Sequence, residues 1–251
     1  MIDAHCHLQD ERLQNNLDAV ITRARSAGVQ RVVCCGVEES DWESVLQLNK
    51  RYPDFMTPSF GLHPWYVKNR SADWLKKLEG YLTQTPSGVG EVGLDFALTD
   101  YEETEQTDVF VQQLTLARKY QRPVSIHCRK AWEALVRIVK KEGPFASGGL
   151  VHSYSGAVDF IPSLCQANLS ISFSGSITRS NNKRGHRALL AVSLERLLIE
   201  TDSPDIPLAG DMGLNEPANL TRVAQAVANI RQVPLAQIIH ITQENTKNIF
   251  C

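Results

Sequence analysis

No long hydrophobic run occurs in this sequence of 251 residues, and that absence excludes a transmembrane helix. A transmembrane helix needs about 18 or more consecutive apolar residues, and no stretch of the chain approaches that length. The opening residues MIDAHCHLQDE carry Asp3 and Glu11 and lack both a basic start and an apolar core, so they are not typical of a signal peptide. We therefore expect a cytoplasmic protein with no membrane partner.

Paired cysteines and an excess of charge are also missing. The six cysteines include no CxxC pair, and Cys34 and Cys35 adjoin within an apolar run, as buried free thiols do in a reducing compartment. Basic and acidic residues number 26 and 28, which gives a net charge of −2. This balance excludes a broadly basic nucleic-acid coat protein and a polybasic membrane binder, although it leaves room for a local basic patch.

What the sequence does contain is a regular alternation of short apolar runs and helical patterns. The runs have the length of strands buried on both faces and cover residues 2–7, 31–36, 57–61, 89–92, 123–127, 149–152, 169–173 and 197–201. Amphipathic patterns typical of helices cover residues 16–27, 41–51, 105–120, 131–142 and 219–230. No linker, low-complexity tract or repeat divides the chain. We predict one α/β domain over residues 1–251, a single (β/α)8 TIM-type barrel, in preference to a doubly wound sheet.

Histidines and carboxylates gather at the carboxyl ends of these runs, where a parallel barrel places its active site. They are His5, His7, Glu91, His127, His152 and Asp202. His5 and His7 point to the same side of a strand because side chains alternate, so both imidazoles can bind one cation. Imidazole and carboxylate ligands without thiolate suit Zn, Mn, Fe or Mg, and six ligands exceed what one catalytic ion needs. We therefore predict two divalent metal ions per subunit that share a carboxylate.

Each of these residues also has a purely structural interpretation. A histidine after a strand is often a polar residue with satisfied hydrogen bonds, Glu91 could pair with an arginine, and Asp202 could cap the turn that follows it. Their joint placement at strand ends favours metal binding. In such a centre Asp202 is the candidate to orient the attacking water and accept its proton. We predict Asp202 and Glu91 as the catalytic residues.

Candidate substrate-binding residues follow other runs. His63 ends the third run and could contact substrate or be satisfied by backbone near Pro64, and Arg129 could bind a phosphate or form a surface ion pair. The densest basic run, residues 179–187, follows the seventh strand and could bind nucleic-acid phosphates or be a solvated loop. Its candidate phosphate ligands are Arg179, Lys183 and Arg184. The aromatic residues after the third run, Trp65, Tyr66 and Trp74, could stack bases, but capping the barrel rim is the favoured interpretation.

Several of these residues lie in an ordered series of motifs that spans the chain. The motifs are DAHCHL (3–8), GLHP (61–64), GEVGLD (90–95), PVSIHCRKA (123–131), VHSYSG (151–156), ETDSP (200–204), NEPAN (215–219) and the ending NTKNIF (245–250). In this series the chain resembles the TatD-type metal-dependent deoxyribonuclease family, within the amidohydrolase-like barrels. The resemblance implies a barrel with a binuclear site and an activity on DNA.

The resemblance also implies a distribution of ligands. One ion would be held by His5, His7, Glu91 and Asp202, and the other by Glu91, His127 and His152, with Glu91 bridging the two. The chain departs from the family pattern at Ala4, at the pair 153–154, which reads Ser-Tyr in place of the commoner Cys-Phe, and at Asp205, where an aromatic residue is common. None of these departures removes a ligand, but those at the rim bear on substrate preference.

Three functional hypotheses follow. The favoured one is a divalent-metal-dependent hydrolase, a TatD-like deoxyribonuclease and in particular an exonuclease, that cleaves DNA phosphodiester bonds with a metal-activated water. The second is hydrolysis of a small phosphate ester, amide or ester in the same site. The third is a metal-stabilised binding protein without catalysis. The sequence points to DNA or a small phosphate-containing substrate as partner and to no obligate protein partner.

Overall fold

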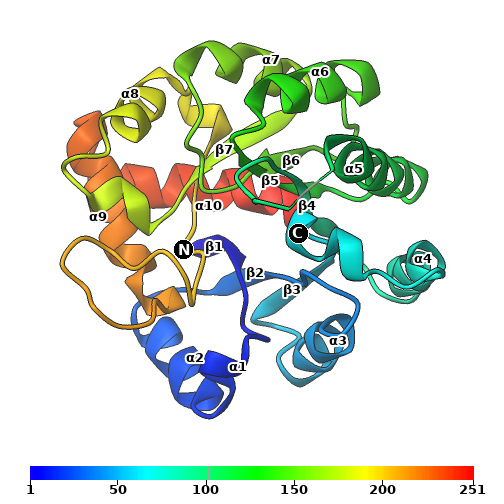
Figure 1. Ribbon diagram of the computed structural model, residues 1–251. Helices are drawn as coiled ribbons and strands as arrows, with labels where there is room; N and C mark the ends of the chain where they lie inside the picture. The colour runs from blue at the N-terminus through cyan, green and yellow to red at the C-terminus, as the bar shows by residue number, and fades with distance from the viewer. Residues whose placement is uncertain (101) are drawn as a thin grey trace.

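A computed structural model describes residues 1–100 and 102–251, and its centre is an eight-stranded parallel sheet (Figure 1). The strands are neighbours in sequence order and comprise β1 (Ile2–Cys6), β2 (Arg31–Cys35), β3 (Met56–Phe60), β4 (Gly88–Asp95), β5 (Val124–Arg129), β6 (Gly149–Val151), β7 (Leu169–Phe173) and β8 (Leu197–Ile199). All eight predicted strands are present, and the predicted barrel is confirmed. β4 is longer than its apolar run because it continues through Asp95.

Ten α-helices surround the strands in the described part of the chain (Figure 1). They are α1 (Glu11–Gln14), α2 (Leu17–Ser26), α3 (Trp42–Arg51), α4 (Trp74–Gln84), α5 (Glu103–Lys119), α6 (Trp132–Glu142), α7 (Ile161–Gln166), α8 (Lys183–Ala191), α9 (Leu220–Arg231) and α10 (Leu235–Phe250). The five helical patterns are confirmed within about two residues at each end. In α2, for example, Leu17, Val20, Ile21 and Ala24 are the buried residues, as the spacing predicts. Over the residues described, no helix is both long and apolar enough to cross a membrane.

The barrel closes between its first and last strands through backbone hydrogen bonds just beyond β8. The N–H of Asp202 donates to the carbonyl of His5 (3.0 Å), and the N–H of His7 donates to the carbonyl of Ser203 (2.7 Å). These bonds place the chain after β8 beside the end of β1. Two segments almost 200 residues apart in sequence are thereby joined at the face that carries the histidines.

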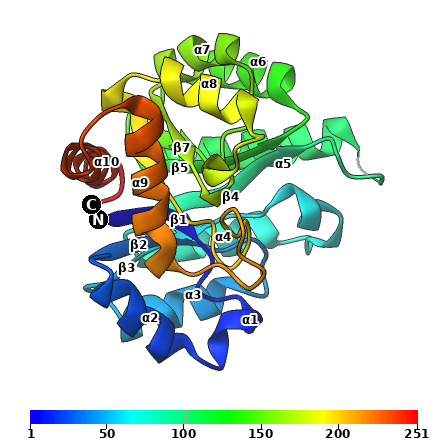
Figure 2. The same ribbon diagram turned by 90° about the vertical axis from the view of Figure 1, so that its left-hand side faces the viewer.

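One end of the barrel is covered and the other is open to loops. α10 lies across the amino ends of the strands, next to both chain termini (Figure 2). At its end Phe250 packs with the small apolar cluster inside the barrel, which includes Ala4, Val33, Leu150 and Leu198. The larger apolar core lies between the strands and the surrounding helices. Polar side chains therefore collect at the opposite end, where the strands finish.

Close contact between β4 and β5 positions two of the predicted ligands. Gly93 has φ +147, and a Cβ at this position would lie 2.0 Å from the carbonyl oxygen of His127. Only glycine avoids this clash without moving the backbone. The sequence GEVGLD thus allows Glu91 and His127, on neighbouring strands, to point into the same space.

Candidate metal centre

The other five predicted ligands converge around the carboxylate of Glu91, which is 3% exposed. Its two oxygens face different histidines. Oε2 lies 3.2 Å from Nε2 of His5 and 3.4 Å from Nε2 of His7. Oε1 lies 2.8 Å from Nε2 of His152 and 3.0 Å from Nδ1 of His127. One buried carboxylate therefore separates two groups of imidazole nitrogens.

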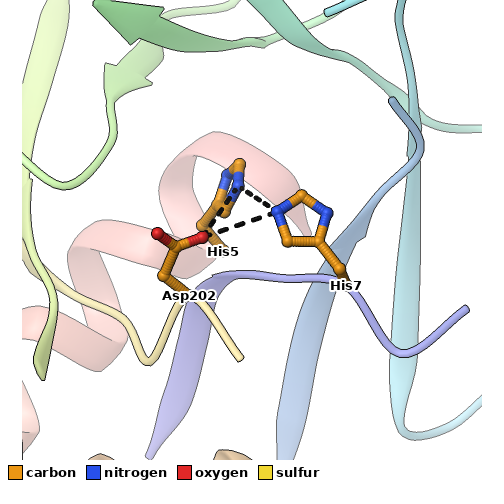
Figure 3. A group of neighbouring side chains, drawn as sticks. All are labelled: His5, His7 and Asp202. Atoms are coloured by element: carbon orange, nitrogen blue, oxygen red, sulfur yellow. Dashed lines mark hydrogen bonds and ion pairs between the residues drawn. The ribbon is translucent and has the colours of Figure 1, made fainter. Parts of the chain in front are cut away.

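The first group combines the end of β1 with the segment after β8. Figure 3 shows the side chains of His5, His7 and Asp202 pointing toward one another. The Nε2 atoms of the two histidines are 3.2 Å apart, and Oδ1 of Asp202 lies 3.8 Å from that of His5 and 3.5 Å from that of His7. The donor atoms of all three fall within 4.8 Å of one another. Two imidazoles and a carboxylate at this spacing form a suitable binding site for a divalent cation.

Hydrogen bonds behind this group orient the rings. Nδ1 of His7 lies 2.8 Å from the carbonyl oxygen of Cys35, so this nitrogen carries the proton and Nε2 presents its lone pair to the centre. Nδ1 of His5 lies 2.8 Å from Oγ of Ser125. The ring orientation that metal binding requires is thus already imposed by neighbouring strands.

The second group has carboxylates behind its histidines. Nε2 of His127 lies 3.4 Å from Oδ2 of Asp95, and Nδ1 of His152 lies 3.5 Å from Oε1 of Glu200. Both carboxylates belong to fully buried residues. A carboxylate behind a histidine fixes its tautomer and raises its basicity toward a metal. Asp95 and Glu200 were not singled out from the sequence, although they stand at the end of GEVGLD and the start of ETDSP.

His63 lies beside the second group but differs from it in protonation. Its Nε2 is 3.3 Å from Oε1 of Glu91, and its Nδ1 accepts the backbone N–H of Trp65 at 3.1 Å. Burial is the main cause that lowers the pKa of His63 to about 4, so the ring is neutral. Because Nδ1 accepts, the single proton is on Nε2, which makes this nitrogen a hydrogen-bond donor toward the centre. The donor atoms of His63, Glu91 and His127 also lie within 4.8 Å of one another, so their spacing would fit a cation, and it is the proton on Nε2 that favours substrate contact.

Electrostatics show that the centre is built for positive charge. Burial acts to raise the pKa of Glu91, but His152, His63 and His5 hold it well below its usual range. Burial also acts to raise the pKa of Asp202, but the hydrogen bond from His7 and the neighbouring histidines lower it to about 2. No Lys or Arg forms an ion pair with either carboxylate among the residues described. Two ionised, buried carboxylates surrounded by imidazoles fit divalent cations.

The remaining predicted residues lie at the rim of the same face. The side chain of Arg129 is 58% exposed, and its NH1 is 4.0 Å from Oδ2 of Asp95. Arg179 is exposed and donates to the carbonyl of Pro207, in the loop after β8. Lys183 and Arg184 are exposed in the first turn of α8 and have no ion pair with any described residue. The basic run is thus partly a helix, capped by the side chain of Asn182, and it lies outside the buried centre.

A parallel barrel with a buried cluster of histidines and carboxylates at the carboxyl ends of its strands defines the metal-dependent hydrolases of the amidohydrolase-like fold. The family model described as "TatD related DNase" matches residues 2–251, so the chain belongs to that family. The resemblance inferred from the motifs is therefore confirmed across the chain.

Relatives over the full length support this assignment. The chain is 31% identical over 256 residues to the "Uncharacterized metal-dependent hydrolase YabD" of Bacillus subtilis, covering 100% of this chain and 98% of that protein. It is 30% identical over 258 residues to the "3'-5' ssDNA/RNA exonuclease TatD" of Edwardsiella piscicida, covering 100% of this chain and 99% of that protein. The crystal structure of YJJV, a TatD homologue from Escherichia coli K12, superposes with a TM-score of 0.95 at 30% identity and covers 100% and 97%. These matches confirm the prediction of a metal-dependent hydrolase that acts on ester bonds. They disfavour the alternative of a binding protein without catalysis.

Proposed function

We propose that this protein is a deoxyribonuclease, an exonuclease that hydrolyses DNA phosphodiester bonds with two divalent cations. The observation that carries the proposal is the position of Glu91, whose two carboxylate oxygens face two separate groups of imidazole nitrogens. A single ion would need only one of these groups, whereas a shared carboxylate between two groups is typical of binuclear hydrolytic sites.

The ligands divide as follows in this proposal. His5, His7 and Asp202, with Glu91, would hold one cation. His127 and His152, again with Glu91, would hold the other. Zn, Mg and Mn all suit these nitrogen and oxygen donors. When bound, the cations make a water molecule more acidic and neutralise charge on the phosphoryl oxygens.

Two residues of the chain act on the reacting groups. Asp202 is ionised and points into the centre, so it orients the attacking water and accepts its proton. His63 is neutral and its donor nitrogen lies at the centre, 3.3 Å from Oε1 of Glu91, so a phosphoryl oxygen bound beside Glu91 would accept a hydrogen bond from it. The deep burial of the centre limits attack to phosphodiesters that reach the open end of the barrel.

Basic residues at the rim of the barrel bind DNA phosphates that lie away from the bond being cleaved. Arg129, Arg179, Lys183 and Arg184 are exposed at the catalytic face, where parallel strands end. Their charge is local, which suits a chain with a net charge of −2. Relatives named as a ssDNA/RNA exonuclease and as a deoxyribonuclease support a nucleic-acid substrate. We further propose that residues 1–251 work as one domain in the cytoplasm, where the six free cysteines stay reduced.

A substrate panel with metal analysis tests the proposal. The purified protein is analysed for bound metal and then assayed with labelled single-stranded DNA, a simple phosphodiester, a phosphomonoester and an anilide. We expect about two divalent ions per chain and turnover of the DNA. Turnover of the small substrates alone would overturn the nuclease assignment in favour of a small phosphate ester, amide or ester as substrate. A content of one ion or fewer at full activity would overturn the binuclear centre.

A further inference from the structure

Trp65 is an exposed aromatic side chain at the edge of the metal centre. Its side chain belongs to a residue that is 52% exposed, whereas the other tryptophans, Trp42, Trp74 and Trp132, are all buried. It lies in the 3-10 helix Pro64–Asn69, beyond β3 and two residues after His63. A single exposed apolar side chain needs no partner by itself, so what distinguishes Trp65 is how its ring is held.

The indole is held by a hydrogen bond at its edge. Nε1 of Trp65 donates to Oδ2 of Asp95 at 2.7 Å, and Asp95 is fully buried. The other oxygen of Asp95 accepts the backbone N–H of Ala97 at 2.9 Å, which fixes the carboxylate in turn. The only polar atom of the ring is therefore satisfied inside the protein. The exposed part of the indole therefore consists of its apolar ring atoms.

The same carboxylate links the indole to the site of reaction. Oδ2 of Asp95 lies 3.4 Å from Nε2 of His127 and 4.0 Å from NH1 of Arg129. The ring of His63 contacts that of Trp65 edge to face, with centroids 5.0 Å apart and planes at 88°. The indole is thus placed at fixed distance from the second histidine group, with an exposed guanidinium beside it.

We propose that Trp65 is a stacking platform for an unpaired nucleobase of the substrate, and that Asp95 is the residue that positions it. The inference rests on the proposed function and names a feature of its substrate. An anchored aromatic ring next to an exposed guanidinium is the combination by which proteins hold single strands, with bases on the ring and phosphates on the charge. A base inside a duplex has both faces covered, so the platform selects unpaired strand ends.

Binding of matched oligonucleotides tests this inference on the intact, metal-loaded protein. The probes are phosphorothioate single strands of equal length, one of thymidines and one of abasic residues, because neither is readily hydrolysed and both carry the same backbone charge. We expect wild-type protein to bind the thymidine probe about tenfold more tightly than the abasic probe, from the usual strength of stacking on one ring. The thymidine probe alone should quench tryptophan emission, since Trp65 is the exposed indole.

Variants test whether the preference for the thymidine probe over the abasic probe comes from Trp65. Trp65→Leu should bind both probes with equal affinity, and Trp65→Phe, which keeps a ring and loses the N–H, should retain part of the preference. Leu190→Ala removes another exposed apolar side chain, on α8, and should leave it unchanged. Unchanged melting temperature and metal content show that each variant is folded. A base preference that survives in Trp65→Leu, or none in wild type, overturns the inference.

The outcomes also separate this inference from the proposed function. If wild-type protein shows the base preference and quenching but hydrolyses no ordinary DNA, the nuclease proposal fails and the base platform stands. If it hydrolyses single-stranded DNA and Trp65→Leu has an unchanged KM and no loss of base preference, the platform fails and the nuclease proposal stands. When both hold, Trp65→Leu should raise KM for single-stranded DNA about tenfold.

Discussion

Asp3 and Thr201, which are 198 residues apart in sequence, form two hydrogen bonds across the closure of the barrel. Oδ1 of Asp3 accepts the backbone N–H of Thr201 at 2.9 Å, and the hydroxyl of Thr201 donates to Oδ2. Both residues are fully buried. Asp3 stands two residues before His5, and Thr201 directly precedes Asp202. The bonds that join the first strand to the chain after the last one therefore also fix the spacing of two metal-ligand candidates.

Replacing Asp3 by asparagine should change how stability depends on pH. Burial raises the pKa of Asp3 from 3.8 to about 7 in the folded chain. Between these two pH values the unfolded chain has lost this proton and the folded chain has kept it, so the free energy of unfolding falls as pH rises. The fall is about 4 kcal/mol at most, at ~1.4 kcal/mol per pKa unit.

Urea unfolding of chelator-treated protein from pH 4 to pH 7 measures this effect. The stability of wild type should fall relative to Asp3→Asn across that range, because the variant does not titrate. Asp108→Asn, an exposed change on α5, serves as the control and should follow wild type. Parallel curves for wild type and Asp3→Asn would falsify the raised pKa.

Glu91→Gln should disable both halves of the metal centre. The amide has one oxygen in place of two and carries no charge, so it cannot serve both groups of histidines. We expect metal affinity to fall by about 100-fold or more, above the 10–100-fold that is usual for residues behind the ligands. Calorimetric titration with Zn or Mn and elemental analysis measure the loss. Glu133→Gln on the exposed face of α6 should bind metal as wild type does.

Asp202→Asn should separate catalysis from metal binding. The change removes the group that accepts the proton of water while the histidines and Glu91 remain. We expect turnover of single-stranded DNA to fall by about 10³-fold, within the usual range for a general base, with at least one ion still bound. Steady-state kinetics and metal analysis on the same preparation give both values. Near-normal turnover would refute the role of Asp202, and Asp159→Asn provides an exposed control.

Glu200→Gln tests the carboxylate behind His152. Glu200 is fully buried and also accepts the backbone N–H of Ser153 at 2.6 Å, so an amide of the same size keeps the packing. Loss of its charge should lower the basicity of His152 and weaken metal binding about 10- to 100-fold. Competition with a metal indicator dye measures the change. An affinity equal to that of wild type would show that Glu200 only supports the backbone.

The double change Lys183→Ala and Arg184→Ala should weaken DNA binding without affecting the centre. Each lost phosphate contact makes the slope of log K against log salt shallower by about 0.7 for single strands, so two contacts give about 1.4. Fluorescence anisotropy at several salt concentrations measures this slope. Lys140→Ala with Lys141→Ala removes the same charge from the last turn of α6, the helix that leads into β6. If both pairs change the slope equally, the start of α8 has no special role.

Much of the fold and the ligand set can be predicted from the sequence because both depend on local patterns. Eight apolar runs of strand length alternate with five amphipathic helical patterns, and parallel strands place their carboxyl ends on one face. His5, His7, Glu91 and Asp202 stand at such ends, so their meeting follows from position in the chain. Arg129 at the rim follows from the same logic, two residues beyond His127.

Other features depend on contacts between distant segments. Trp65 and Trp74 are both aromatic residues after β3, yet the first is exposed and the second is buried, because the carboxylate of Asp95 on β4 holds the indole of Trp65 at the rim. The backbone N–H of Trp65 decides which nitrogen of His63 is the donor. The partner behind His152 is the carboxylate of Glu200, which lies two residues before Asp202 in the sequence.

The sequence by itself thus determined the barrel and which residues meet at its open end, since strand order and side-chain alternation are local properties of the chain. Only the tertiary structure decided which oxygen of Glu91 faces which histidines and which nitrogen of each ring points inward. Those choices depend on hydrogen bonds from other strands, and the direction of such bonds is set when the barrel closes.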